Sequence, residues 1–140
     1  CLIGHPFMRI QLHELLKKEK KMAKILIADD SLAELKIFQA ALQSTGHSIV
    51  TVMDGEAAEA KVKSEKIDLI ILDVVMPKKN GFQVCRDIKS NDQYKNIPVI
   101  MVTSKDQESD KFWGMKQGAD EYLIKPFKPE DLLKAVKKYI

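Results

Sequence analysis

The sequence predicts an α/β fold, a doubly wound parallel sheet with helices on both faces. From Lys24 onward, runs rich in β-branched and aliphatic residues alternate with segments of helical apolar spacing. Such alternation is typical of parallel strands joined by crossover helices. Three of the runs are apolar throughout, as expected of central strands that are covered on both faces. The length of 140 residues suits one domain.

Five segments have the composition and length of strands. They are 24–28, 48–52, 69–72, 99–102 and 121–124. The first, third and fourth are continuously apolar, which places them in the middle of the sheet.

Five helices are predicted between and after the strands, at 32–44, 55–64, 82–90, 106–117 and 129–139. Ser31 and Asp54 stand where a helix N-cap is wanted, and Pro129 occupies a first helical position. Gly46 and Gly118 follow two of the helices, where the backbone commonly turns left-handed.

The first 22 residues differ in composition from the rest. They hold five basic and two acidic side chains, which accounts for the whole net charge of +3. Residues 23–140 are therefore neutral overall, without the basic patch that nucleic-acid binding requires. Met22 followed at once by a strand resembles a natural start, so we expect residues 1–22 to be an N-terminal extension, partly helical or disordered. It would come from an expression vector or an alternative start site.

The composition also limits the setting of the protein. Cys1 and Cys85 are too few and too far apart to indicate a disulfide framework or a metal cage. The longest apolar runs are far shorter than the roughly 18 residues that a membrane-spanning helix needs. We therefore expect a soluble, cytoplasmic protein with no membrane insertion.

Polar side chains follow four of the predicted strands. Asp29 and Asp30 follow the first strand and Asp73 follows the third, while Thr103 with Ser104 follows the fourth and Lys125 the fifth. Ligands of open parallel sheets bind beyond the carboxyl ends of the strands, so these groups are expected to share one crevice. Taken singly, Asp29 to Ser31 or Thr103 to Ser104 could be helix caps, and Lys125 could be a loop lysine.

Three carboxylates in one crevice need a cation. Each pair at 4 Å repels by roughly 4 kcal/mol at an effective dielectric constant of 20. Oxygen ligands without His or Cys favour a hard ion, and a sparse, hydrated set suits Mg²⁺, with Mn²⁺ as a substitute, better than Ca²⁺. Lys125 supplies a second positive charge, suited to a phosphoryl oxygen.

With these residues assembled, the stretch 23–140 resembles the receiver domain of two-component response regulators. The motifs that carry the resemblance are IADDS at 27–31, LDVVMPKKNG at 72–81, Thr103, and YLIKPF at 122–127. Within the family, the sequence TSKDQESDK at 103–111, with Trp113-Gly114 and QGA at 117–119, looks most like the PilH-type stand-alone regulators of type IV pilus twitching motility.

The resemblance implies a CheY-like (βα)₅ fold of strand order 2-1-3-4-5, in which Asp73 accepts a phosphoryl group from a histidine kinase of the CheA-like kind. Asp30, Asp73 and the backbone carbonyl of Val75 would bind Mg²⁺ directly, and Asp29 through water. Lys125 and Thr103 would hold the phosphoryl oxygens, with a cis peptide bond between Lys125 and Pro126. Such a protein is a phosphoacceptor with self-catalysed phosphotransfer and autodephosphorylation, not an enzyme with turnover.

Thr103 and Tyr122 take the place of the family's switch residues. After phosphorylation Thr103 would move inward and Tyr122 would turn into the vacated space, which would change the face made by helix 106–117, strand 121–124 and helix 129–139. A protein partner would read that face. For Tyr122 the plainer interpretation is an aromatic of an edge strand.

Several alternatives stay open at this point. The phosphoprotein could act on a pilus motor or adaptor, or it could serve as a phosphate sink for a shared kinase. A flavodoxin-like mononucleotide binder shares the sheet order, but Asp29 and Asp30 would repel a phosphate there. A metal-dependent phosphatase with an aspartyl nucleophile usually wants a second acid at the position of Val75. That apolar residue also predicts slow to moderate autodephosphorylation, because it cannot orient a water molecule.

Overall fold

The computed structural model describes residues 22–140. Within them, five parallel strands form one sheet in the order β2-β1-β3-β4-β5, which confirms the predicted fold class. The predicted extension 1–22 lies outside the described residues except for Met22. The strands are β1 (Lys24–Ala28), β2 (Ser48–Val52), β3 (Leu69–Leu72), β4 (Val99–Thr103) and β5 (Glu121–Ile124).

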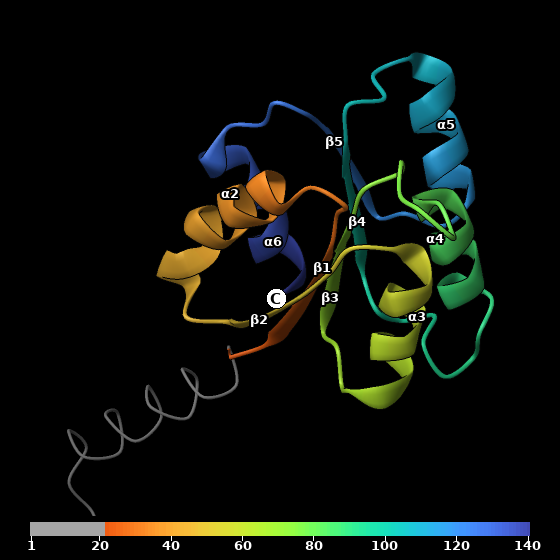
Figure 1. Ribbon diagram of the computed structural model, residues 1–140, viewed down its shortest axis with the longest axis horizontal. Coiled ribbons are helices and arrows are strands. Elements are labelled where there is room, and N and C mark those ends of the chain that lie inside the picture. Colours follow the sequence, from red (N-terminus) through yellow and green to blue (C-terminus); the bar gives the residue numbers. More distant parts are fainter. Residues whose placement is uncertain (1–21) are drawn as a thin grey trace, which may run out of the picture.

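Helices cover both faces of the sheet (Figure 1). Within residues 22–140 they are α2 (Leu32–Leu42), the short 3₁₀ helix η2 (Gln43–Thr45), α3 (Gly55–Ser64), α4 (Gly81–Lys89), α5 (Glu108–Lys116) and α6 (Pro129–Tyr139). Figure 1 shows α2 and α6 on one face and α3, α4 and α5 on the other. No helix in the described part of the chain is long and apolar enough to cross a membrane.

Alternate residues of the central strands pack against opposite layers of helices. Ile25 and Ile27 of β1 belong to the core beneath α2 and α6, together with Leu35 and Phe38 of α2. Leu26 of β1 belongs to the core on the other face. Because successive side chains of a strand point to opposite faces, only a continuously apolar strand can fill both cores.

The register of the strands brings their carboxyl ends to one edge of the sheet. Ala28 of β1 is paired with Leu72 of β3, and Leu72 is paired with Met101 of β4. Thr103 is paired with Ile124 at the end of β5. The residues that follow these strands therefore emerge close together, as the site requires.

The helix boundaries follow local capping chemistry. The side chains of Ser31 and Asp54 accept hydrogen bonds from the backbone N–H groups of Glu34 and Ala57, as N-caps do. Gly46 and Gly118 have φ angles of +74° and +106° and end their helices in the left-handed region.

Four predicted elements differ from the structure by one or two residues at their ends. The helix predicted at 32–44 is α-helical to Leu42 and continues as η2, while the strand predicted at 99–102 extends through Thr103. The helix predicted at 82–90 begins at Gly81, because Asn80 and Gln83 form a reciprocal capping box. The helix predicted at 106–117 begins at Glu108, where Asp110 accepts from the backbone N–H of Gln107.

Candidate functional site

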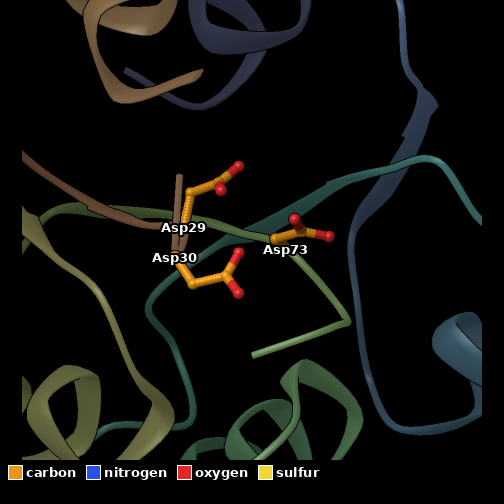
Figure 2. Close-up of side chains that lie close together, drawn as sticks. All are labelled: Asp29, Asp30 and Asp73. Atoms are coloured by element: carbon orange, nitrogen blue, oxygen red, sulfur yellow. The ribbon is translucent and has the colours of Figure 1, made fainter. Parts of the chain in front are cut away.

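Three carboxylates gather at the carboxyl ends of β1 and β3 (Figure 2). One oxygen from each of Asp29, Asp30 and Asp73 lies within 4.8 Å of the others. Asp29 is 1% exposed and Asp73 is 8% exposed, whereas Asp30 is exposed. Since ionised side chains are seldom buried without a partner, the two buried carboxylates require a compensating positive charge.

Asp29 and Asp30 reach the same crevice because the chain bends away from the sheet between them. The backbone N–H of Asp29 still donates to Val52 of β2, at 3.1 Å. Asp30 lies in a bend, and the N–H of Ser31 turns back to donate to Asp29 Oδ1, at 3.0 Å. The adjacent carboxylates therefore do not diverge as they would within a straight strand.

Lys125 is the positive charge that faces this cluster. Its Nζ lies 2.6 Å from Asp29 Oδ2 and 3.0 Å from Asp73 Oδ2. The side chain is 13% exposed. The backbone N–H of Lys125 donates to the carbonyl of Thr103, and the peptide bond to Pro126 is cis. The loop after β5 thus holds the ammonium over both buried carboxylates.

The electrostatics of Lys125 and Asp29 reflect burial and pairing together. Burial raises the pKa of the Asp29 carboxyl, and hydrogen bonds from Lys125 and Ser31 offset only part of this effect. Burial alone would lower the pKa of Lys125, but its hydrogen bonds to Asp29 and Asp73 outweigh it and the net pKa is raised. The lysine is therefore a fixed cation at neutral pH, while Asp29 holds its charge less firmly.

Each oxygen of Asp73 has a defined partner. Oδ1 accepts a hydrogen bond of 2.7 Å from the backbone N–H of Val74, and Oδ2 accepts one of 3.0 Å from Lys125. The backbone N–H of Asp73 donates to Ala28 of β1, at 3.0 Å. The carboxylate is thus fixed in orientation, at the mouth of the sheet.

The donor set fits a hard divalent cation. Asp29, Asp30 and Asp73 offer only oxygen ligands, which Mg²⁺ prefers to nitrogen or sulfur. The exposed side of the cluster, at Asp30 and Val75, is open to the water molecules that Mg²⁺ normally keeps. Lys125 offsets the charge on the buried side, so the charges of the cluster suit one divalent cation with an anionic group beside it.

Thr103 and Tyr122 are both hydrogen-bonded to the peptide groups of Lys105. The fully buried Thr103 accepts a hydrogen bond from the N–H of Lys105 on Oγ1, at 3.3 Å. The Tyr122 hydroxyl donates to the carbonyl of Lys105, at 2.8 Å. Tyr122 is 8% exposed, and its burial raises the pKa of its hydroxyl to about 12. The ring is therefore buried, with its hydroxyl held by the carbonyl of Lys105.

Two residues beside the site were not singled out from the sequence. Glu34 Oε2 lies 3.8 Å from Lys125 Nζ and adds a third carboxylate around the lysine, after Asp29 and Asp73. Its position three residues after the N-cap Ser31 was the available signal. Gly81 lies against the carbonyl of Asp73, where an added Cβ would come within 2.1 Å of the oxygen. The glycine of the 72–81 motif is thus a packing requirement.

Comparisons with known proteins agree with this geometry. Residues 25–137 match the response regulator receiver domain family. Protein PilH of Pseudomonas aeruginosa is 45% identical over 115 residues, which cover 82% of this chain and 95% of that protein.

Solved structures are similar as well. The chemotaxis protein CheY4 of Vibrio cholerae superposes with a TM-score of 0.78 and is 37% identical, with 85% of this chain and 99% of that chain covered. The receiver domain of a sensor histidine kinase from Pseudomonas aeruginosa superposes with a TM-score of 0.78 at 25% identity, covering 84% of this chain and 97% of that chain. That structure has a magnesium ion coordinated in its active-site cleft.

Proposed function

Because the chain belongs to the response-regulator receiver family, we propose that it is a stand-alone response regulator whose phosphoacceptor is Asp73. The donor is the phosphohistidine of a sensor histidine kinase. The observation that carries the assignment is the position of Lys125, whose Nζ lies within 3.0 Å of both Asp73 and Asp29 beside the acidic cluster. Phosphorylation by histidine kinases and dependence on Mg²⁺ are general properties of receiver domains.

In the transfer, an oxygen of Asp73 attacks the phosphorus of the phosphohistidine. The new O–P bond makes an acyl phosphate, while the P–N bond breaks and its electron pair returns to the imidazole nitrogen. Such a transfer depends on positioning and charge neutralisation more than on a general base. The pairing of Lys125 with Asp73 places an ammonium where a phosphoryl oxygen would arrive.

Asp29, Asp30, Asp73 and the backbone carbonyl of Val75 are the groups proposed to hold Mg²⁺, which would supply a second positive charge for the phosphoryl oxygens. Mn²⁺ should substitute, because it accepts the same oxygen ligands. On the protein's side, the N–H of Val74 keeps Asp73 oriented through Oδ1. Lys125 limits the repulsion among the carboxylates before a donor arrives.

The output would pass through Thr103 and the Lys105 peptide groups. A phosphoryl group on Asp73 brings strong acceptor oxygens. Movement of the Thr103 hydroxyl toward one of them would lengthen the hydrogen bond that it accepts from the N–H of Lys105. The carbonyl of Lys105 also anchors Tyr122. Movement of this segment would therefore alter the start of α5 and the face formed by α5, β5 and α6.

That face is the proposed surface for a downstream protein. Phe112 and Trp113 of α5 and Ile124 of β5 are exposed apolar residues there, with exposed fractions of 66%, 47% and 38%. Exposed apolar side chains of this size are typical of protein-binding surfaces. The sequence identity of 45% to PilH supports a role in type IV pilus twitching or chemotaxis-like signalling. The proposed phosphoryl donor is a CheA-like kinase, and the proposed location is the cytoplasm.

Acetyl phosphate is a kinase-free test of this function. In the presence of Mg²⁺, we expect the intact mass of the protein to rise by one phosphoryl group, and EDTA to prevent the rise. The half-exposed Trp113 should also change its fluorescence when beryllofluoride and Mg²⁺ are added together. A protein whose mass and fluorescence stay the same with acetyl phosphate, beryllofluoride and Mg²⁺ would not be a phosphoacceptor of this kind.

A further inference from the structure

Helix α5 is attached to the sheet in an unusual way. Of its residues, all of which the structure describes, only Gly114 is buried. Its large apolar residues Phe112, Trp113 and Met115 are 66%, 47% and 42% exposed. A surface helix normally packs through a stripe of large apolar side chains. In α5 the residue that faces the sheet is Gly114, which has no side chain.

The missing side chain makes room for Tyr122. A Cβ added to Gly114 would lie 3.0 Å from Cδ2 and Cε2 of the Tyr122 ring and 3.0 Å from Sδ of Met101. These distances are shorter than ordinary van der Waals contacts, so the ring, Met101 or the helix would have to give way. The backbone of α5 at Gly114 thus packs closely against the Cδ2 and Cε2 side of the ring.

Tyr122 in turn is fixed at its hydroxyl end. Its O–H donates to the carbonyl of Lys105 at 2.8 Å, and the N–H of the same residue donates to Thr103 at 3.3 Å. The ring is thus confined by α5 on one side and by this hydrogen bond at its tip. Of the two constraints, only the one from α5 depends on the absence of a side chain.

We propose that Gly114 is a positioning residue for Tyr122: by lacking a side chain, it forms the slot that keeps the tyrosine ring buried. Phosphorylation acts on the segment between Thr103 and Lys105, to which the ring is already joined. This last consequence rests on the proposed function, whereas the slot itself does not.

The test follows the tyrosine hydroxyl in the unphosphorylated protein. Nuclear magnetic resonance of protein labelled with ¹³C at the tyrosine ring carbon that bears the hydroxyl gives the pKa of each tyrosine, and the signal absent from Tyr122→Phe identifies Tyr122. In the wild-type protein this pKa should be about 12. In Gly114→Ala and, further, in Gly114→Leu, it should fall toward the ordinary value of 10.0 as the ring loses its slot.

Two controls separate loss of the slot from general damage. Met115→Ala changes a neighbouring exposed residue of α5 and should leave the pKa of Tyr122 near 12. In a Tyr122→Ala background the ring is gone and only Met101 Sδ remains at 3.0 Å from the added Cβ, so Gly114→Ala should lower the melting temperature less than it does in the wild type. Alanine also suits a helix better than glycine does, so α5 itself is not weakened by the change.

The proposal is wrong if the pKa of Tyr122 stays near 12 in both Gly114 variants, including the case in which α5 moves outward and the ring stays buried. It is also wrong if Gly114→Ala lowers the melting temperature equally with and without the Tyr122 ring. Because no phosphodonor is present, these results do not depend on Asp73. Failure of Asp73 to accept a phosphoryl group would overturn the proposed function and leave the role of Gly114 intact.

Discussion

Lys125 and Asp29 form a buried ion pair of 2.6 Å between residues that are 96 positions apart in the sequence. The pair is shorter than the contact of 3.0 Å between the lysine and Asp73. Lys125 therefore has a structural partner as well as a proposed catalytic one. The ammonium stabilises a carboxylate that is almost fully buried, and it remains close enough to Asp73 to meet an incoming phosphoryl group.

Replacing Lys125 by Met should destabilise the protein, because it leaves buried carboxylates without their cation. Removal of one partner from a buried ion pair commonly costs about 3 kcal/mol. The loss should be smaller at about pH 5 than at about pH 8, because the raised pKa of Asp29 lets it take up a proton and lose its charge. Urea unfolding at the two pH values measures both effects.

Lys138→Met is the matched control for that change. Lys138 pairs with Glu121 at the same distance of 2.6 Å, but its side chain is 54% exposed. Surface pairs contribute little, so this variant should unfold close to the wild type. If Lys125→Met and Lys138→Met lost the same free energy of unfolding, the buried ion pair would contribute no more to stability than the exposed one.

Mg²⁺ should raise the melting temperature through the acidic cluster. A ligand at about a hundred times its dissociation constant stabilises the folded state by about 2.7 kcal/mol. Asp30→Asn should weaken this response, because it removes one of the three clustered carboxylates. Asp92→Asn, at a side chain that is 97% exposed and outside the cluster, should leave it unchanged. NaCl at matched ionic strength controls for screening. An equal rise in melting temperature with Mg²⁺ in the wild type, Asp30→Asn and Asp92→Asn would contradict a Mg²⁺ site at the acidic cluster.

Gly81→Ala should be strongly destabilising and should also reduce phosphorylation of Asp73. The added Cβ would come within 2.1 Å of the Asp73 carbonyl oxygen. The nearest atoms all belong to the backbone of Asp73 and Val74, so they cannot move aside as a flexible side chain could. We expect a loss of about 3 kcal/mol in chemical unfolding.

Gly46→Ala tests whether contact, and not loss of a glycine, causes that effect. A Cβ at Gly46 meets no atom within 4 Å, although its φ of +74° disfavours other residues. The cost there should be about 1 kcal/mol, with phosphorylation unaffected. If Gly81→Ala were as stable as Gly46→Ala or more so, the loop after Asp73 would have to shift easily, and this prediction would be wrong.

Glu65 should contribute to stability in mildly acidic solution. Hydrogen bonds from Lys61 and Lys24 lower the pKa of Glu65 from 4.5 to about 2. A carboxyl whose pKa is lower in the folded state stabilises the protein above its unfolded pKa, and the contribution is lost as the pH falls from 4.5 toward 2. Glu65→Gln should therefore lose less stability than the wild type over this range, as followed by urea unfolding. Parallel pH profiles would contradict the pairing.

The sequence was sufficient for the sheet and for most of the acidic site. Continuous apolar runs identified the central strands, because only a strand buried on both faces has no polar side. The motif at 72–81 and the acidic pair Asp29 and Asp30 were recognisable because each lies where a strand ends. Their meeting in space follows from parallel register, which is a general property of this fold class.

Other features depend on contacts that no local pattern encodes. The preference of Lys125 for Asp29 over Asp73 is set by the loop after β5, far away in the chain. The close approach of Gly114 to the Tyr122 ring is made across the helix–sheet interface. A glycine within a predicted helix gives no sign of which ring packs against it, so this contact had to come from the structure.

The most direct test of the proposed function is phosphotransfer from a kinase that carries ³²P-phosphohistidine, with wild type, Asp73→Asn and Asp92→Asn compared in Mg²⁺. The wild type and Asp92→Asn should both take up label that hydroxylamine removes, as expected of an acyl phosphate. Asp73→Asn should take up none, because the amide cannot act as the nucleophile. Label that survives in Asp73→Asn would contradict the assignment of Asp73 as the phosphoacceptor.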